Sequence, residues 1–335
     1  MTPNLKLKNK NILVTGGAGF IGSNLCEYLL SCDSNVTCLD NFSTGHKHNI
    51  EQFIDNPNFK FIEGDIRDLE TCRKACLHQE FVLHQAAIGS VPRSLDDPIT
   101  TNEVNISGFL NMLVAARDQN IKRFIFAASS STYGDSEKLP KVEDEIGKPL
   151  SPYAVTKYVN EIYADVFQKF YGLDYIGLRY FNVFGRRQDP NGAYAAVIPL
   201  FVKQLKNYVS PIINGDGSYS RDFTYIDNVI QMNVLAITSE NQQALNEIYN
   251  TAVGNRTNLN ELLILLRDTL SNLDSKIAKI KINYGPNRDG DIPHSLASID
   301  KAKELLNYKP SHSVKKGINE AIDWYWDNLN NSKTK

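Results

Sequence analysis

The chain has 335 residues, with 38 acidic and 36 basic side chains and a formal net charge of −2 at pH 7. This length predicts one large domain with a smaller appendage. The near balance of charge provides no basic field for nucleic acid or an anionic membrane, so an anionic ligand must be held by a local site. The first ten residues lack the apolar segment of a secretory signal, and no apolar run approaches about 18 residues. We therefore expect a cytoplasmic protein without a membrane span.

The cysteines indicate reduced thiols. They are Cys26, Cys32, Cys38, Cys72 and Cys76, an odd number without a secretory signal. Cys72 and Cys76 are one helical turn apart, but no second pair of Cys or His follows at ligand spacing. We interpret them as core packing and expect no metal site.

Short strand-like segments alternate with helical ones in the first half of the chain. The predicted strands are Asn11–Thr15, Val36–Leu39, Phe59–Ile62, Phe81–His84, Arg123–Ala127 and Tyr175–Arg179. The predicted helices are Ile21–Ser31, Leu69–His78, Asn102–Gln119 and Pro152–Phe170. Alternation at this spacing predicts an α/β fold, a Rossmann-type doubly wound parallel sheet with helices on both faces.

The alternation breaks after Phe181. A polar loop spans Gly185–Gly192, a helix is predicted near Val197–Asn207, and short strands and further helices follow. The simplest architecture is a smaller, discontinuous α/β domain over the carboxyl ends of the strands. We predict that residues 1–182 and roughly 222–254 form the cofactor domain, and that roughly 183–221 and 255–330 form the substrate domain.

Three glycines follow the first predicted strand and open the first predicted helix: Gly16, Gly19 and Gly22. In this context Gly16 makes a tight turn, Gly19 lets the backbone approach a pyrophosphate, and Gly22 lets the helix pack against the strand. A glycine triplet alone is weak evidence, but its place in the first strand–helix turn predicts a dinucleotide site.

Acidic residues follow the second and third predicted strands. Asp40 ends the second strand, 18 residues after Gly22. A carboxylate there accepts hydrogen bonds from ribose hydroxyls and repels a 2′-phosphate, which favours NAD over NADP. Asp65 and Ile66 follow the third strand, where an adenine is expected. The alternatives are an ordinary loop acid at Asp40 and a solvated turn at Asp65.

Tyr153 and Lys157 are four residues apart in a predicted helix, so their side chains share one face. A nearby ammonium and a nicotinamide cation favour the phenolate and lower the tyrosine pKa from its ordinary value of about 10. Ser129 lies at the carboxyl end of the fifth predicted strand and is the third catalytic candidate, because its hydroxyl can share a proton with Tyr153 and a substrate oxygen. Ser130 and Ser131 are candidates for substrate hydrogen bonds. The alternatives are an exposed helix face and serines that satisfy their own backbone.

The chain resembles the UDP-hexose 4-epimerase branch of the extended short-chain dehydrogenases from about Lys10 to Trp326. It is more closely similar to the UDP-N-acetylglucosamine 4-epimerases of bacterial surface-polysaccharide pathways. The segments that carry this resemblance are Asp40–Gly45, His84–Ser94, Ser129–Gly134, Pro149–Tyr158, Leu178–Gly192, Asn214–Gly217, Ser220–Phe223 and Arg288–Asp291.

The resemblance implies further site residues. Those implied for a tightly bound NAD are Phe20, Ile21, Asn41, Ser43, Gly45, Gln85, Ala86, Ala87, Asn105 and Tyr180. Those implied for a UDP-sugar are Gly89, Ser90, Asn182, Val197, Asn214, Arg221, Arg288, Asp291 and Ser295. Arginines suit a diphosphate because their planar forks bind phosphate oxygens bidentately.

The resemblance implies epimerisation at C4 of UDP-N-acetylglucosamine and UDP-N-acetylgalactosamine through a 4-keto intermediate, by a homodimer. Ser295 stands where a bulky tyrosine would exclude an N-acetyl group, although an ordinary loop serine is the alternative. Rival substrates are UDP-N-acetylglucosaminuronic acid and UDP-glucose or UDP-galactose. Ser130 and Ser131 disfavour a 4,6-dehydratase, which needs an acid and a base there. An inactive scaffold is disfavoured because Tyr153 and Lys157 are both present.

Overall fold

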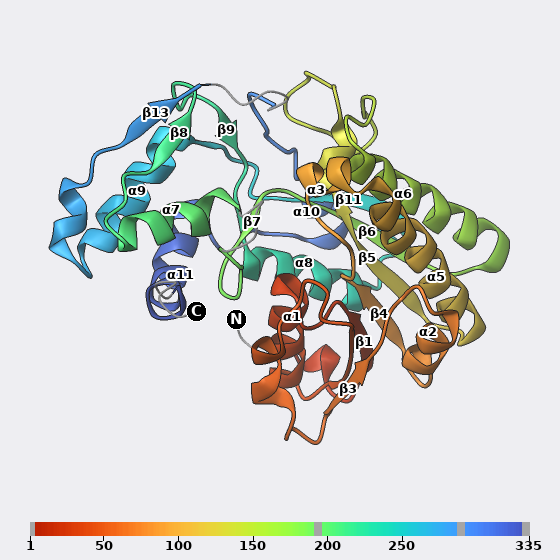
Figure 1. The fold of residues 1–335 in the computed structure, drawn as a ribbon. Helices are drawn as coiled ribbons and strands as arrows, with labels where there is room; N and C mark the ends of the chain where they lie inside the picture. Colours follow the sequence, from red (N-terminus) through yellow and green to blue (C-terminus); the bar gives the residue numbers. More distant parts are fainter. Residues whose placement is uncertain (1–3, 191–195, 287–291, 330–335) are drawn as a thin grey trace.

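The computed structural model describes residues 4–190, 196–286 and 292–329. It has two parts (Figure 1): a large sheet covered by helices, and a lobe of short strands and helices beside it. The lobe is built mainly from the second half of the chain, as the green and blue segments show.

The large sheet has seven parallel strands in the order β11-β6-β5-β4-β1-β2-β3. They are β1 (Asn11–Thr15), β2 (Asn35–Asp40), β3 (Phe59–Glu63), β4 (Phe81–His84), β5 (Arg123–Ser129), β6 (Tyr175–Tyr180) and β11 (Glu247–Thr251). The predicted Rossmann-type fold is confirmed. The order reverses between β1 and β4, and such sheets bind ligands at that point, outside the carboxyl ends of the strands.

Helices cover both faces of the large sheet. α1 (Phe20–Ser31) contacts α8 (Ile226–Thr238) on one face, and α2 (Leu69–Cys76), α5 (Phe109–Asp118) and α6 (Pro152–Tyr171) pack on the other. Successive strand side chains alternate between the two cores: Ile12 and Val14 belong to the first, and Leu13 to the second. Cys72 and Cys76 are buried in the second core. Within the described ranges, no helix combines the length and apolar character needed to cross a bilayer.

The helix predicted at Asn102–Gln119 differs in the structure. α4 (Pro98–Asn102) starts earlier, residues 103–108 form a π-helical turn, and α5 then continues to Asp118. The early start has a local cause, because the Asp97 side chain accepts a hydrogen bond from the Thr100 amide and Pro98 occupies the first turn.

The lobe contains three two-stranded pairs and several helices. The pairs are β7 (Val183–Phe184) with β10 (Thr224–Tyr225), β9 (Ser220–Arg221) with β12 (Thr257–Asn258), and β8 (Ile212–Asn214) with β13 (Asn283–Gly285). Its helices include α7 (Val197–Lys206), α9 (Leu259–Ser271) and α11 (Val314–Asn328), while α3 (Val91–Asp96) and α10 (Asp300–Leu306) lie nearer the sheet. The exact domain boundaries stay a prediction.

Candidate active site

Two adjoining cavities open where the strands of the large sheet end. The first has a volume of about 380 Å³ and is lined by residues that follow β1, β2, β3, β4, β5 and β6. The second, of about 360 Å³, is lined by β7, α7, β8, β9 and the start of α9. Asn182 and Val183 line both cavities. A ligand in the first cavity can therefore meet a ligand in the second.

The glycine turn forms one end of the first cavity. Gly16 has a φ of +66°, a conformation that glycine adopts without strain. A Cβ on Gly22 would collide with the Gly16 carbonyl oxygen, so only glycine lets α1 approach β1 this closely. Gly16, Gly19 and Gly22 line the cavity, and Gly19 is the residue preceding α1. The helix amino terminus thus presents its backbone N–H groups where a pyrophosphate would bind.

Asp40 lies at the carboxyl end of β2 in the wall of the first cavity. Its carboxylate accepts hydrogen bonds from the backbone N–H groups of Ala18, at 2.9 Å, and Phe42, at 2.8 Å. Burial raises the pKa of Asp40, and these N–H groups oppose that rise. The carboxylate is therefore held in place where a ribose would lie. Together with the glycine turn, it fits NAD and disfavours a 2′-phosphate.

Asp65 and Ile66 line the same cavity after β3. The Asp65 carboxylate accepts from the Arg67 guanidinium at 2.8 Å and from the Asn41 amide at 2.9 Å. Hydrogen bonding to Arg67 lowers the pKa of Asp65. This acid is thus positioned by an ion pair rather than left as a solvated turn.

Tyr153, Lys157 and Ser129 all line the first cavity. Pro152 and the Ser151 cap begin α6, which places Tyr153 and Lys157 on successive turns of one face. The Lys157 ammonium donates to the Ala127 carbonyl at 2.8 Å and lies 5.9 Å from the centre of the Tyr153 ring. Ser129 is near enough to Tyr153 to lower the pKa of its phenol. The three predicted catalytic side chains are therefore gathered in one place.

The pKa of Tyr153 differs from the sequence-based expectation. Burial raises it, and the neighbouring Ser129 side chain opposes that rise only in part. Burial also lowers the pKa of Lys157 to about 8. The expected lowering by Lys157 is not seen, and burial of the phenol is the dominant influence on its pKa.

Most of the other predicted residues line one of the two cavities. In the first these are Phe20, Ile21, Asn41, Ser43, Gln85, Ala86, Ala87, Gly89, Tyr180 and Asn182. In the second they are Asn182, Val197, Asn214 and Arg221. The predicted Arg288 and Asp291 lie outside the described residues.

Six predicted residues line neither cavity: Gly45, Ser90, Asn105, Ser130, Ser131 and Ser295. Asn105 instead braces the wall, because its amide oxygen accepts from the Ile88 amide and its nitrogen donates to Thr156. The Ser131 hydroxyl donates to the hydroxyl of Ser129, the predicted catalytic serine, at 2.9 Å.

Three of the four remaining members, Ser90, Gly45 and Ser295, have local backbone roles. The Ser90 side chain caps α3 by accepting from the Arg93 amide. A Cβ on Gly45 would crowd Ala18. The Ser295 amide donates to the Ser220 carbonyl at 3.0 Å, next to Arg221, so Ser295 is tied to the edge of the second cavity.

Sequence reasoning missed several wall residues. In the first cavity they are Leu39, Thr44, Gly64, Ile88, Val104, Ala127, Ala128 and Val183, and in the second Val183, Phe184, Ala196, Ile198, Leu200, Phe201, Ile212, Phe223 and Leu259. Asn233 of α8 was also missed; it donates to the Tyr180 hydroxyl at 2.9 Å, which in turn donates to Gln85 at 3.1 Å. Positions just after strands were a usable signal for Gly64 and Ile88. No sequence signal singles out Asn233, because in the sequence it looks like any other polar residue of a helix.

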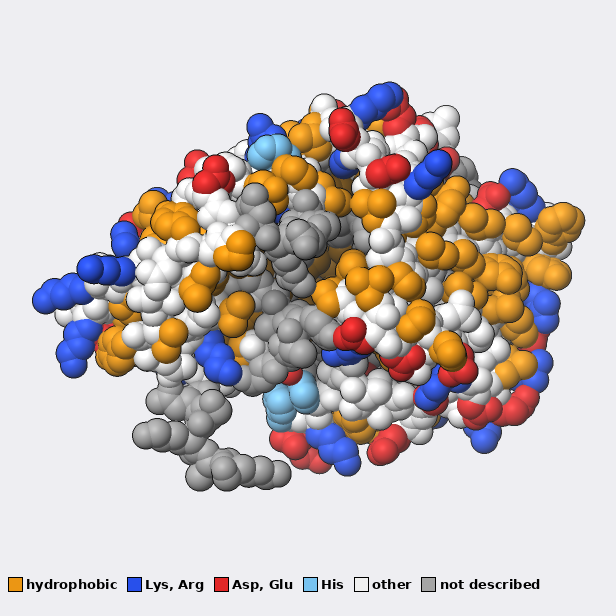
Figure 2. Space-filling view, turned by 45° about the horizontal axis from the view of Figure 1, so that its top comes forward, with side chains coloured by type: hydrophobic (Ala, Val, Ile, Leu, Met, Phe, Trp, Pro, Cys, Tyr) orange, Lys and Arg blue, Asp and Glu red, His pale blue; other side chains and the backbone are white. Residues whose placement is uncertain are grey.

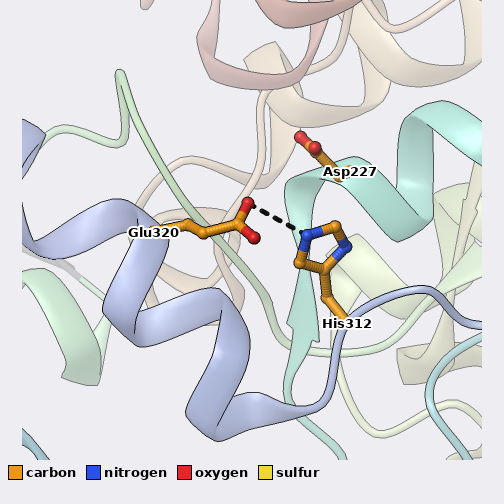
Figure 3. A group of neighbouring side chains, drawn as sticks. All are labelled: Asp227, His312 and Glu320. Carbon is orange, nitrogen blue, oxygen red and sulfur yellow. Dashed lines mark hydrogen bonds and ion pairs between the residues drawn. The ribbon is translucent and has the colours of Figure 1, made fainter. Parts of the chain in front are cut away.

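Asp227, His312 and Glu320 form a ligand-type cluster away from both cavities (Figure 3). Their ligand atoms lie within 4.8 Å of one another. His312 bonds Glu320 at 3.0 Å, and Asp227 pairs with Arg186 at 3.3 Å. Asn228 of α8 also donates to the His312 carbonyl at 2.8 Å, so the cluster lies where α8 meets the segment before α11.

Comparisons with known proteins agree with this geometry. The model of the NAD dependent epimerase/dehydratase family matches residues 12–252. The structure of a UDP-N-acetylglucosamine 4-epimerase from Methanobrevibacter ruminantium M1, in complex with UDP-N-acetylmuramic acid, is 38% identical, covers 96% of this chain and 99% of that chain, and has a TM-score of 0.89. A UDP-glucose 4-epimerase from Thermotoga maritima, with UDP-glucose, is 36% identical over 96% of this chain and 100% of that chain, with a TM-score of 0.87.

A third solved relative is a UDP-glucuronic acid 4-epimerase from Bacillus cereus in complex with UDP-glucuronic acid and NAD. It is 31% identical, covers 94% of this chain and 99% of that chain, and has a TM-score of 0.85. NAD is the cofactor of this chain, as the family and the first cavity together indicate. The chain belongs to the NAD dependent epimerase/dehydratase family, in its UDP-hexose 4-epimerase branch.

Proposed function

We propose that this protein interconverts UDP-N-acetylglucosamine and UDP-N-acetylgalactosamine by NAD-dependent epimerisation at C4, for surface-polysaccharide synthesis. The observation that carries the proposal is the pair of adjoining cavities. The first contains the glycine turn, Asp40 and the catalytic candidates, while the second brings Arg221 to a space that shares Asn182 with the first. A dinucleotide and a nucleotide sugar placed end to end need this arrangement.

In the proposed reaction Tyr153 moves the proton of the C4 hydroxyl. As a phenolate it takes this proton and later returns it, and Ser129 shares the proton between the phenol and the sugar oxygen. Bound NAD⁺ supplies the hydride acceptor and a positive charge that favours the phenolate. Lys157 is held by the Ala127 carbonyl on the same helix face, within reach of a cofactor ribose.

The sugar must rotate between the two hydride transfers while the UDP stays bound. We assign the UDP to the second cavity, where Arg221, Asn214 and Asn182 supply polar groups and Val197 and Phe201 supply apolar wall. A guanidinium binds diphosphate oxygens in pairs. Strong contacts to the nucleotide and weak contacts to the sugar allow the 4-keto sugar to rotate without escaping.

The charge of the first cavity favours a neutral sugar over a uronic acid. Among the described residues that line it, Lys157 is the only cation, and its ammonium already bonds the Ala127 carbonyl. Asp40 and Asp65 are anions in the same wall. A uronate carboxylate buried here would lack a dedicated cationic partner, which is costly.

The test is to give purified enzyme, without added NAD, three substrates separately: UDP-N-acetylglucosamine, UDP-N-acetylglucosaminuronic acid and UDP-glucose. We expect turnover without added cofactor, because the protein retains NAD through purification, and the highest initial rate with UDP-N-acetylglucosamine. A higher rate with either of the others would replace the proposed sugar. No rate with any of the three would refute the proposed epimerase activity.

We also propose a homodimer that pairs through α6. One side of α6 exposes large apolar side chains, including Ile162, 48% exposed, and Phe170, 77% exposed. Leu95 of α3 and Ile99 of α4 add to this surface, and Figure 2 shows hydrophobic side chains gathered on the side of the molecule where α6 lies. Extended exposed apolar patches mark interfaces. Light scattering of the Ile162→Glu variant should show a monomer where the wild type is a dimer; a wild-type monomer contradicts the proposal.

A further inference from the structure

Asp222 is a buried carboxylate that no cation of the described residues neutralises. Its side chain is fully buried, and among the described residues no Lys, Arg or His lies within ion-pair distance of it. Its partners are backbone N–H groups: Val253 donates at 3.0 Å, Gly254 at 3.0 Å and Ala297 at 3.4 Å. A buried charge held only by backbone dipoles is expensive, so its retention points to a task.

The residues beside Asp222 form the wall of the second cavity. Arg221 and Phe223, its two neighbours in the chain, both line that cavity. The backbone carbonyl of Asp222 also accepts from the side chain of Asn182 at 3.2 Å, and Asn182 lines both cavities. The position of Asp222 therefore sets the positions of three wall side chains.

The donors to Asp222 come from two distant segments. Val253 and Gly254 follow β11, the edge strand of the large sheet, and Gly254 has a φ of +75°. Ala297 belongs to the segment that contains Ser295, and its backbone pairs with Lys141 from the other side. One side chain thus joins the large sheet, the lobe and the segment proposed to bound the sugar.

Burial raises the pKa of Asp222 to about 6, while the backbone N–H groups oppose the rise. A carboxylate offers lone pairs to several N–H donors at once, whereas an asparagine of the same shape turns an NH₂ toward them. Asp222→Asn therefore keeps the volume and replaces one of the two acceptor oxygens with a donor NH₂. This substitution separates the hydrogen bonds of the side chain from its packing.

We propose that Asp222 is a positioning residue, which holds Arg221 and Asn182 in the positions from which they bind the diphosphate of the nucleotide sugar. The proposal rests on the assignment of the UDP to the second cavity. Asp222 acts through the wall residues of the second cavity and not by contact with substrate, because its carboxylate is enclosed by protein. The nucleotide, rather than the cofactor or the reacting C4, is the part of the reaction that depends on it.

The test measures UDP binding by calorimetry to the NAD-containing enzyme, and kcat and KM with UDP-N-acetylglucosamine. For Asp222→Asn we expect the Kd for UDP and the KM to rise about tenfold, with kcat and bound NAD changed much less. Asp227→Asn is the matched control, because Asp227 is a second buried aspartate five residues along the chain whose partner is Arg186. That control should leave the Kd for UDP at the wild-type value.

A wild-type enzyme that does not bind UDP refutes the proposed function, and this result is distinct from failure of the inference. Wild-type affinity for UDP in Asp222→Asn overturns the inference alone, as does an equal loss of affinity in both aspartate variants. If Asp222→Asn does not fold, Gly254→Ala is the second variant. Gly254 donates its N–H to the Asp222 carboxylate, and a Cβ there strains the positive φ and so disturbs this hydrogen bond. We then expect a smaller rise in the Kd for UDP with unchanged NAD content, and an unchanged Kd contradicts the proposal.

Discussion

The two cavities differ in how their walls are built. The first is lined mainly by turns that follow parallel strands, together with helical residues such as Tyr153 and Lys157, so its residues recur at intervals along the first 183 positions. The second is lined by residues between 182 and 259 from short strands and helices, and it is held by contacts such as those of Asp222. Local backbone geometry positions most of the first site, and long-range hydrogen bonds have the larger part in positioning the second. Changes in the first should remove chemistry or cofactor, and changes in the second should weaken or redirect substrate binding.

The largest effect is expected from Tyr153→Phe in the first cavity. This variant removes the proton-transferring hydroxyl and keeps the ring, so kcat should fall about 1,000-fold. UDP binding and NAD content should stay at wild-type values, because neither depends on the phenol oxygen. Initial rates and calorimetry check both expectations. Retention of full activity would show that Tyr153 is not the base.

A pH profile of stability should single out Asp222 in the second region. Its pKa is raised from 3.8 to about 6 in the folded chain, so between these values the folded state keeps a proton that the unfolded state releases. The resulting stability is fully present below about pH 4 and is lost as the pH rises through 6. Urea unfolding should show that wild type loses roughly 3 kcal/mol relative to Asp222→Asn between pH 4 and pH 7. Parallel profiles for the two proteins would contradict this.

Gly22→Ala tests the local geometry of the first cavity. The added Cβ would collide with the backbone of Gly16 and Gly17, which cannot move without opening the turn. We expect a loss of about 2 kcal/mol in the free energy of unfolding and purified protein with less bound NAD, measured by absorbance. Gly89→Ala is the control, since Gly89 lines the same cavity and a Cβ there meets nothing within 4 Å. Equal NAD content in the two variants would contradict the view that local backbone geometry positions the first cavity.

The smallest effect concerns sugar choice at Ser295. If this segment bounds the sugar, Ser295→Tyr should lower kcat/KM for UDP-N-acetylglucosamine relative to UDP-glucose by about tenfold. Ser295→Ala keeps the space and should preserve the ratio, which separates size from loss of the hydroxyl. An unchanged ratio in Ser295→Tyr would place the determinant of sugar choice elsewhere.

The sequence by itself determined the Rossmann-type sheet, the glycine turn and the Tyr153–Lys157 pair, because each depends on spacing within one strand, turn or helix. It also identified Asp40, whose place follows from the end of a strand. Only the tertiary structure showed that Asn105 braces Ile88, that β11 completes the sheet, and that Asn182, Asn214 and Arg221 share a cavity. Hydrogen bonds between residues far apart in the chain produce no repeating pattern in the sequence from which they could be predicted. Asp222 lies in a polar stretch that reads as surface loop, and only folding shows it to be buried and surrounded by backbone donors.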